Sequence, residues 1–158
     1  MSQGSQTPPQ PRPSPPGPPP GPPPAVGSML PAVTRRVSTV QIFRYSAATW
    51  NTHRIHYDQG YAAAEGYPGV LVQSHLHGAF LVQYCTDWMG PGGRLLALSL
   101  SVRRYAVAGQ QLTVAGEVTA LEQQPDGSLA VSLRLTETRD ADGEACATGS
   151  ARILFPPG

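Results

Sequence analysis

Residues 51–58 bring together side chains that can move protons or hold an oxygen atom. The segment reads Asn-Thr-His-Arg-Ile-His-Tyr-Asp and includes two of the four histidines, His53 and His56. Imidazole has an unperturbed pKa of about 6.5, so it can take a proton from water near neutral pH. An amide such as Asn51 cannot act as a base, but it can hold a water or a substrate oxygen by hydrogen bonds. By residue type alone, a histidine here is more often structural, and Asp58 is more often a helix cap.

A longer run around this segment carries a more specific motif. It begins at Arg44, continues through Trp50 to Asp58, and is followed by Glu-Gly-Tyr-Pro-Gly at residues 65–69. It resembles the hydratase motif of the MaoC-like acyl dehydratase and R-specific enoyl-CoA hydratase family, most closely its mesaconyl-CoA hydratase-like branch. The resemblance covers roughly residues 38–156. It implies a hot-dog fold and a hydro-lyase that adds water to, or removes water from, an acyl thioester.

The resemblance also implies roles for individual residues. In the wider family, an Asp and a His five residues later form the acid/base pair; His56 occupies the His position and Asn51 the Asp position. The closer branch also tends to carry Asn. His56 is therefore the expected proton-transfer residue, with Asn51 beside it in the catalytic site. Asp58 is the nearest carboxylate and an alternative second group, whereas His53 is expected to be a loop residue.

The start of the next helix is where the family places its oxyanion donor. This chain has Gln73-Ser74 where the family usually has His-Gly. A backbone N–H survives any substitution except proline, and a helix N-terminus favours negative charge. Ser74 and His75 are therefore the expected oxyanion-binding residues. Gly69 and Arg54 complete the expected substrate-binding set, with Arg54 a candidate for phosphate contact or simply a solvated charge.

Two other functions remain open from the residues. Asn51 and the Gln73-Ser74 departure motivate a second hypothesis, a non-catalytic hot-dog subunit that pairs with a catalytic partner. A hot-dog acyl-CoA thioesterase is the third reading, but it needs a carboxylate facing the thioester from the long helix, and Asp87 lies at the far end. Because hot-dog sites typically form between two hot-dog units, we expect a homodimer or a hot-dog heterodimer. No metal or cofactor is expected, since the substrate itself carries coenzyme A or phosphopantetheine.

The elements around the motif follow from periodicity. Residues 38–46 are rich in β-branched and aromatic side chains, which predicts a first strand. Asp58 is expected to cap a short helix through residues 61–64. The spacing of Leu76, Phe80, Tyr84 and Trp88 gives one apolar stripe, so residues 74–88 are predicted to form a long helix that ends before Gly90-Pro91.

The remainder alternates with the period of a strand. Apolar residues recur at every second position in residues 96–102, 112–120 and 129–135, and residues 147–155 form the expected last strand. Pro125-Asp126-Gly127 and the Asp-Ala-Asp-Gly sequence at 140–143 are typical hairpin turns. A sheet with one apolar face needs a cover, and the long helix supplies it. The pattern predicts an α+β fold, with an antiparallel sheet wrapped around a central helix.

Composition divides the chain and excludes several classes. Most of the 18 prolines lie between Pro8 and Pro31, and Arg12 is the only charged residue in 1–28. We therefore expect a disordered Pro/Gly-rich tail at 1–36 and one hot-dog domain at 37–158. A net charge of +1, with no basic cluster beyond paired arginines, does not indicate nucleic-acid binding. No apolar run is long enough for a membrane span, and Cys85 and Cys146 are expected to be buried thiols. The cytoplasm is the expected compartment.

Overall fold

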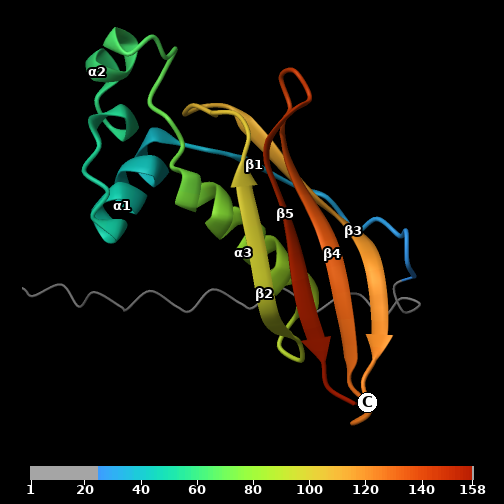
Figure 1. Cartoon of the computed structure of the whole chain (residues 1–158). Coiled ribbons are helices and arrows are strands. Elements are labelled where there is room, and N and C mark those ends of the chain that lie inside the picture. Colours follow the sequence, from blue (N-terminus) through green and yellow to red (C-terminus); the bar gives the residue numbers. More distant parts are fainter. Residues whose placement is uncertain (1–24, 158) are drawn as a thin grey trace, which may run out of the picture.

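The computed structural model describes residues 25–157, which form one antiparallel five-stranded sheet wrapped around a long helix (Figure 1). The strand order is β1-β3-β4-β5-β2. The elements are β1 (Val33–Arg36), α1 (Thr39–Thr49), the 3-10 turn η1 (Arg54–His56), α2 (Gln59–Ala64), α3 (Ser74–Met89), β2 (Arg94–Val102), β3 (Gln111–Gln123), β4 (Leu129–Arg139) and β5 (Glu144–Phe155). The α+β hot-dog prediction is confirmed. The expected disordered tail falls partly on residues 1–24, which lie outside the described residues.

The folded part begins earlier than predicted. Residues 33–36 form β1, which pairs with β3 in the register Val33 to Val114. Before β1, Met29 bridges Glu117, and Leu30 is 7% exposed and packs into the core. The proposed boundary after residue 36 was therefore wrong for residues 25–36, because strand pairing and burial of one leucine hold this Pro-poor end of the tail against the sheet.

The predicted strand at 38–46 was also wrong, because this segment is the helix α1. Ser38 caps it by accepting a hydrogen bond from the Gln41 N–H at 3.1 Å. Ile42 and Ser46, four residues apart, face the protein interior and are both buried. β-branched residues favour strands only weakly, and here the cap and the burial of one helical face outweigh that preference.

The other two predicted helices are confirmed. The Asp58 carboxylate caps α2 by accepting from the Tyr61 N–H at 2.9 Å. In α3, the predicted stripe faces the sheet, with Leu76, Phe80 and Tyr84 no more than 3% exposed. None of the helices within residues 25–157 is both long enough and apolar enough to cross a membrane.

The four strands after α3 are confirmed, with two local corrections. The last strand begins at Glu144 rather than at residue 147. A register shift between Leu95 and Ala97 leaves Leu96 43% exposed, whereas Leu95 packs against the core. A bulge inserts one residue and so reverses the inward and outward faces beyond it, which strict alternation cannot predict.

A buried hydrogen-bonded pair joins α3 to the sheet. Glu137 lies at an inward-facing position of β4, and its carboxyl group contacts Nδ1 of His77; both side chains are at most 1% exposed. Nε2 of His77, the other oxygen of Glu137 and Nε of Arg35 are buried without a partner among the described residues. Polar groups removed from water depend strongly on their hydrogen-bond partners, so this pair constrains how α3 sits on the sheet.

We expect that Glu137→Leu will lower the free energy of unfolding by about 3–5 kcal/mol, because it leaves the buried His77 imidazole without its partner. Urea unfolding followed by tryptophan fluorescence measures the effect. The double variant His77→Leu/Glu137→Leu should recover part of the loss, since no polar group is then stranded. As a control, Glu117→Gln breaks the exposed pair with Arg134 and should cost at most about 1 kcal/mol. Equal losses from both single variants would contradict the assignment.

Candidate functional site

His56 is held by the segment that leads into α3. It is the last residue of η1 and is 8% exposed. The backbone N–H of Leu71 donates to the Ile55 carbonyl at 2.9 Å, and Nδ1 of His56 lies 2.9 Å from the Leu71 carbonyl oxygen. The imidazole is therefore fixed both by its own turn and by a segment fifteen residues away.

The contact with Leu71 determines which nitrogen of His56 carries the proton. A carbonyl oxygen only accepts hydrogen bonds, so Nδ1 must be the donor and Nε2 of the neutral ring keeps its lone pair. Burial lowers the pKa of His56; the Leu71 carbonyl partly opposes this shift, and nearby His53 adds to it. A neutral imidazole with a free Nε2 is the form required of a general base near neutral pH.

His56 lines a pocket of about 310 Å³ between α1 and the segment before α3. Val40 and Phe43 form the α1 side of this pocket, and their side chains are 56% and 58% exposed. The other lining residues are Thr39, Tyr57, Gln59 and Val70. We call this hollow the His56 pocket. Among the described residues that line this pocket, His56 alone carries an imidazole, so proton transfer near neutral pH by these residues depends on His56.

The N-terminus of α3 presents two free backbone donors. The N–H groups of Leu76 and His77 both donate to the Gln73 carbonyl, at 2.9 and 3.2 Å. The N–H groups of Ser74 and His75 precede them and have no backbone acceptor in residues 25–157. The structure does not place these donors in the His56 pocket. His75 instead lines a separate hollow of about 570 Å³ between α3 and β2.

Gln73 is a site-supporting residue that the sequence analysis treated only as a departure from the family motif. Its side chain is fully buried, and its Nε2 donates to the Ile42 carbonyl and to Oγ of Ser46, both at 2.8 Å. These bonds tie α1, which forms one wall of the His56 pocket, to the residue that directly precedes α3. The sequence shows a glutamine before α3 and a small polar residue, Ser46, in an earlier segment. Only the fold shows that these two side chains are hydrogen-bonded to each other.

The remaining predicted site residues are placed as follows. Oδ1 of Asn51 accepts from the His53 N–H at 3.3 Å, and Asn51 does not line the His56 pocket. Gly69 is buried with an added Cβ 3.4 Å from Val107, so its small size serves close packing. Arg54 donates twice to Asp58, at 2.6 and 3.1 Å, and lies over the Tyr61 ring.

Asp58 is a structural carboxylate rather than a proton donor. Its pKa is lowered by the hydrogen bond from the Tyr61 N–H and then by Arg54. It therefore stays ionised at neutral pH. The helix-cap interpretation of Asp58 is confirmed. Because its carboxylate is ionised and hydrogen-bonded to both Tyr61 and Arg54, the alternative in which Asp58 replaces the family's catalytic Asp is not favoured.

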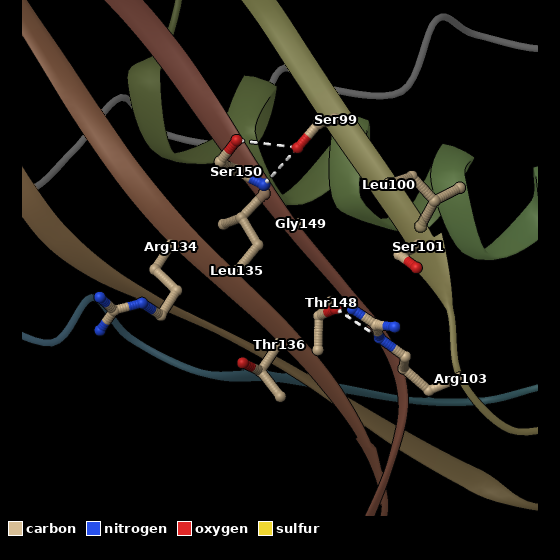
Figure 2. A pocket seen from close by; sticks show the side chains of 10 residues that line it. All are labelled: Ser99, Leu100, Ser101, Arg103, Arg134, Leu135, Thr136, Thr148, Gly149 and Ser150. Atoms are coloured by element: carbon tan, nitrogen blue, oxygen red, sulfur yellow. Dashed lines mark hydrogen bonds between the residues drawn. The ribbon is translucent and has the colours of Figure 1, made fainter.

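A further hollow lies on the face of the sheet opposite α3, across β2, β4 and β5 (Figure 2). It measures about 460 Å³ and is lined mainly by hydroxyl side chains with Arg103 and Arg134 at its sides. Nε of Arg103 donates to Oγ1 of Thr148 at 3.3 Å, and Ser99 and Ser150 pair at 2.8 Å. None of these groups titrates near neutral pH, so this hollow does not supply a general base.

Metal and thiol chemistry receive no support from the described part of the chain. No group of three or more His, Cys, Asp or Glu side chains within residues 25–157 is arranged to hold a metal ion. Cys85 and Cys146 are free and buried as predicted, and burial raises the pKa of Cys85 to about 11. A thiol with such a pKa is a weak nucleophile at neutral pH.

We expect that Gln73→Leu will lower the free energy of unfolding by about 1–3 kcal/mol, because it removes two buried hydrogen bonds, to the Ile42 carbonyl and to the Ser46 hydroxyl. Chemical denaturation measures the change. Gln41→Leu alters an exposed glutamine of α1 and should change stability by less than about 0.5 kcal/mol. Similar effects of the two variants would show that the Gln73 hydrogen bonds do not hold α1.

Comparisons with known proteins identify relatives whose names are those of hydratases of coenzyme A thioesters. Over 55 residues the chain is 47% identical to the mesaconyl-C(4)-CoA hydratase of Chloroflexus aurantiacus, a match that covers 33% of this chain and only 20% of that protein. It is 28% identical over 108 residues to the beta subunit of the 3-oxo-4,17-pregnadiene-20-carboxyl-CoA hydratase of Mycobacterium tuberculosis, covering 68% of this chain and 81% of the relative.

The fold matches a solved hydratase, and the family model gives the assignment. The structure superposes on an (R)-hydratase from A. caviae involved in PHA biosynthesis with a TM-score of 0.74 and 22% identity, covering 84% of this chain and 97% of that one. The model of the family described as hydroxyacyl-thioester dehydratase type 2 matches residues 8–137. The resemblance to MaoC-like hydratases is thus confirmed, and the chain belongs to the hydroxyacyl-thioester dehydratase type 2 family, whose members are hydro-lyases.

Proposed function

We propose that this chain catalyses the reversible addition of water to a 2-enoyl thioester and that His56 transfers the proton. The observation that carries the proposal is the contact of Nδ1 with the Leu71 carbonyl, which leaves Nε2 as the lone-pair nitrogen of a buried ring lining a pocket. In the hydration direction, Nε2 removes a proton from water while the water oxygen bonds to C3 of the acyl group. The imidazolium then returns a proton to C2, so that water is added overall and His56 is regenerated.

Negative charge develops on the thioester oxygen as the C3–O bond forms. Preorganised N–H donors stabilise such a charge most effectively. Ser74 and His75 supply the free N–H groups at the start of α3, and the helix dipole adds to their effect. These donors do not line the His56 pocket, so this role requires the acyl group to extend from the start of α3 to His56, across the segment from Leu71 to Gln73.

The second polar group in this proposal is Asn51, which lies near η1 but does not line the His56 pocket. Its amide donates and accepts hydrogen bonds but is not a general base, so its proposed role is to position the attacking water. Gly69 supports the site by packing against Val107. Arg54 is engaged with Asp58, so contact with a phosphate of the substrate would require it to exchange partners.

The proposed substrates are thioesters of coenzyme A, with carrier-protein thioesters as the second class. The named relatives are hydratases of CoA esters. The reaction needs no metal or redox cofactor in this proposal, because acid–base and oxyanion groups suffice for it. We propose assembly as a homodimer or as a hot-dog heterodimer, and the name of the mycobacterial beta subunit supports assembly from more than one chain. The cytoplasm is the proposed compartment, in keeping with two free buried thiols.

A non-catalytic subunit is the second candidate function. Asn51 stands where the wider family has a carboxylate, and one relative is named as a subunit of a larger hydratase. In that case the His56 pocket would remain folded but would need the partner's groups for turnover.

We expect that the purified chain will hydrate crotonyl-CoA and that His56→Ala will lower kcat/KM by roughly a hundredfold to ten-thousandfold, as for loss of a general base. Asn51→Ala should lower it by about tenfold, through loss of one hydrogen bond to the water, and Asn51→Asp should keep activity. Loss of the ultraviolet absorbance of the conjugated thioester measures the rate. The control is His53→Asn, which removes the neighbouring imidazole but keeps a side chain able to cap η1.

Two outcomes would overturn the catalytic assignment. Unchanged activity in His56→Ala would remove His56 from the reaction. An inactive chain that becomes active only with a second hot-dog chain, recovered by co-purification and seen as a larger mass in light scattering, would favour the non-catalytic subunit.

The pH dependence of kcat/KM should follow the titration of His56. Burial lowers the pKa of this residue from 6.5, and a general base works only when unprotonated. We therefore expect a rate that levels off toward alkaline pH and falls on acidification, with a midpoint below pH 6.5. Thermal unfolding in the same buffers distinguishes titration from loss of structure. A midpoint above the ordinary histidine pKa would contradict the buried, neutral imidazole.

A further inference from the structure

The His56 pocket has a lining without a net charge. Its apolar members are Val40, Phe43, Tyr57 and Val70, and its polar members Thr39 and Gln59 are uncharged. We infer that the site selects acyl chains that end in an uncharged group over acyl chains that end in a carboxylate. This inference rests on the proposed function, because it takes His56 as the group next to the reacting carbons.

The position of His56 determines which part of a thioester enters the pocket. A base must lie within hydrogen-bonding reach of the water that attacks C3. The carbons beyond C3 then lie against the neighbouring walls, which are the exposed faces of Val40 and Phe43 on α1. Apolar surface of this kind gains free energy by covering a hydrocarbon chain, in proportion to the area removed from water.

No arginine among the lining residues is available to meet a substrate carboxylate. Arg54 lies close in sequence to His56, but its guanidinium donates two hydrogen bonds to Asp58 and stacks over Tyr61. Arg44 lies on α1, but it lines a separate hollow with Gln41, Tyr45 and Leu76 rather than the His56 pocket. A carboxylate placed in the pocket would lose water without gaining a cation, which is strongly unfavourable.

The test compares two saturated thioesters that share a carbon skeleton, butyryl-CoA and succinyl-CoA. The second differs by a terminal carboxylate, and neither is turned over by a hydratase, so binding is measured independently of catalysis. Isothermal titration with the full chain should give a Kd for butyryl-CoA that is tighter by about tenfold or more.

A single charge in the lining should change this preference. Phe43→Arg places a guanidinium at an exposed pocket wall, where folding tolerates it, and should shift the ratio of the two Kd values toward succinyl-CoA by about tenfold. Trp50→Arg is the matched control. Trp50 is 84% exposed near the end of the same helix and does not line the pocket. The substitution Trp50→Arg therefore adds the same charge and should leave the ratio of the two Kd values unchanged.

The outcomes separate this inference from the proposed function. Preferential binding of butyryl-CoA that is reduced or abolished in Phe43→Arg supports the inference even if crotonyl-CoA is not hydrated, in which case only the proposed function fails. Equal binding, tighter binding of succinyl-CoA, or no binding of either thioester overturns the inference. The same ratio shift in Trp50→Arg as in Phe43→Arg also overturns it, because general charge attraction would then explain the preference.

Discussion

The hydrogen bonds of residues 70–73 hold together every part of the candidate site. The backbone of Leu71 makes two hydrogen bonds to η1. Its N–H donates to the Ile55 carbonyl, and its carbonyl accepts from the His56 ring. The Val72 N–H donates to the Ala106 carbonyl beside the sheet, and the Gln73 side chain bonds α1. This short segment therefore joins the base, the wall of the pocket and the free N–H groups of α3. These bonds matter for positioning α1, η1 and α2, because α1 and α2 lie beyond the end of α3 rather than on the sheet (Figure 1).

A second constraint places α3 itself. The apolar stripe of this helix determines which face meets the sheet, but apolar contacts alone would let the helix shift along the sheet. The buried pair of His77 and Glu137 does not allow such a shift, because a buried carboxyl group needs its partner within hydrogen-bonding distance. Arg35 of β1 approaches the same region and donates to Gln83 of α3 at 2.8 Å. The core thus combines apolar burial, which supplies stability, with a few polar contacts that define position.

Fold and chemistry are separate conclusions for this chain. The hot-dog architecture accommodates several reactions on acyl thioesters, so the sheet and helix alone do not select hydration. The proposed reaction depends on one imidazole whose tautomer is set by a carbonyl and whose pKa is lowered by burial. In this proposal Asn51, where the chain departs from the wider family, leaves proton transfer to His56 alone. The inferred specificity then depends on the acyl chain, because the described walls of the pocket are uncharged.

The amino-acid sequence by itself determined the elements whose signals are local. The stripe ending at Gly90 specified α3, alternation and turn residues specified the hairpins, and the motif around His56 identified the family, because each depends on neighbours along the chain. Only the tertiary structure decided the rest. Residues 38–46 form a helix rather than a strand because one face is buried against Gln73, and Glu137 is tolerated in β4 because His77 lies opposite it. These outcomes depend on contacts between residues far apart in sequence, whose free energies exceed the weak local preferences.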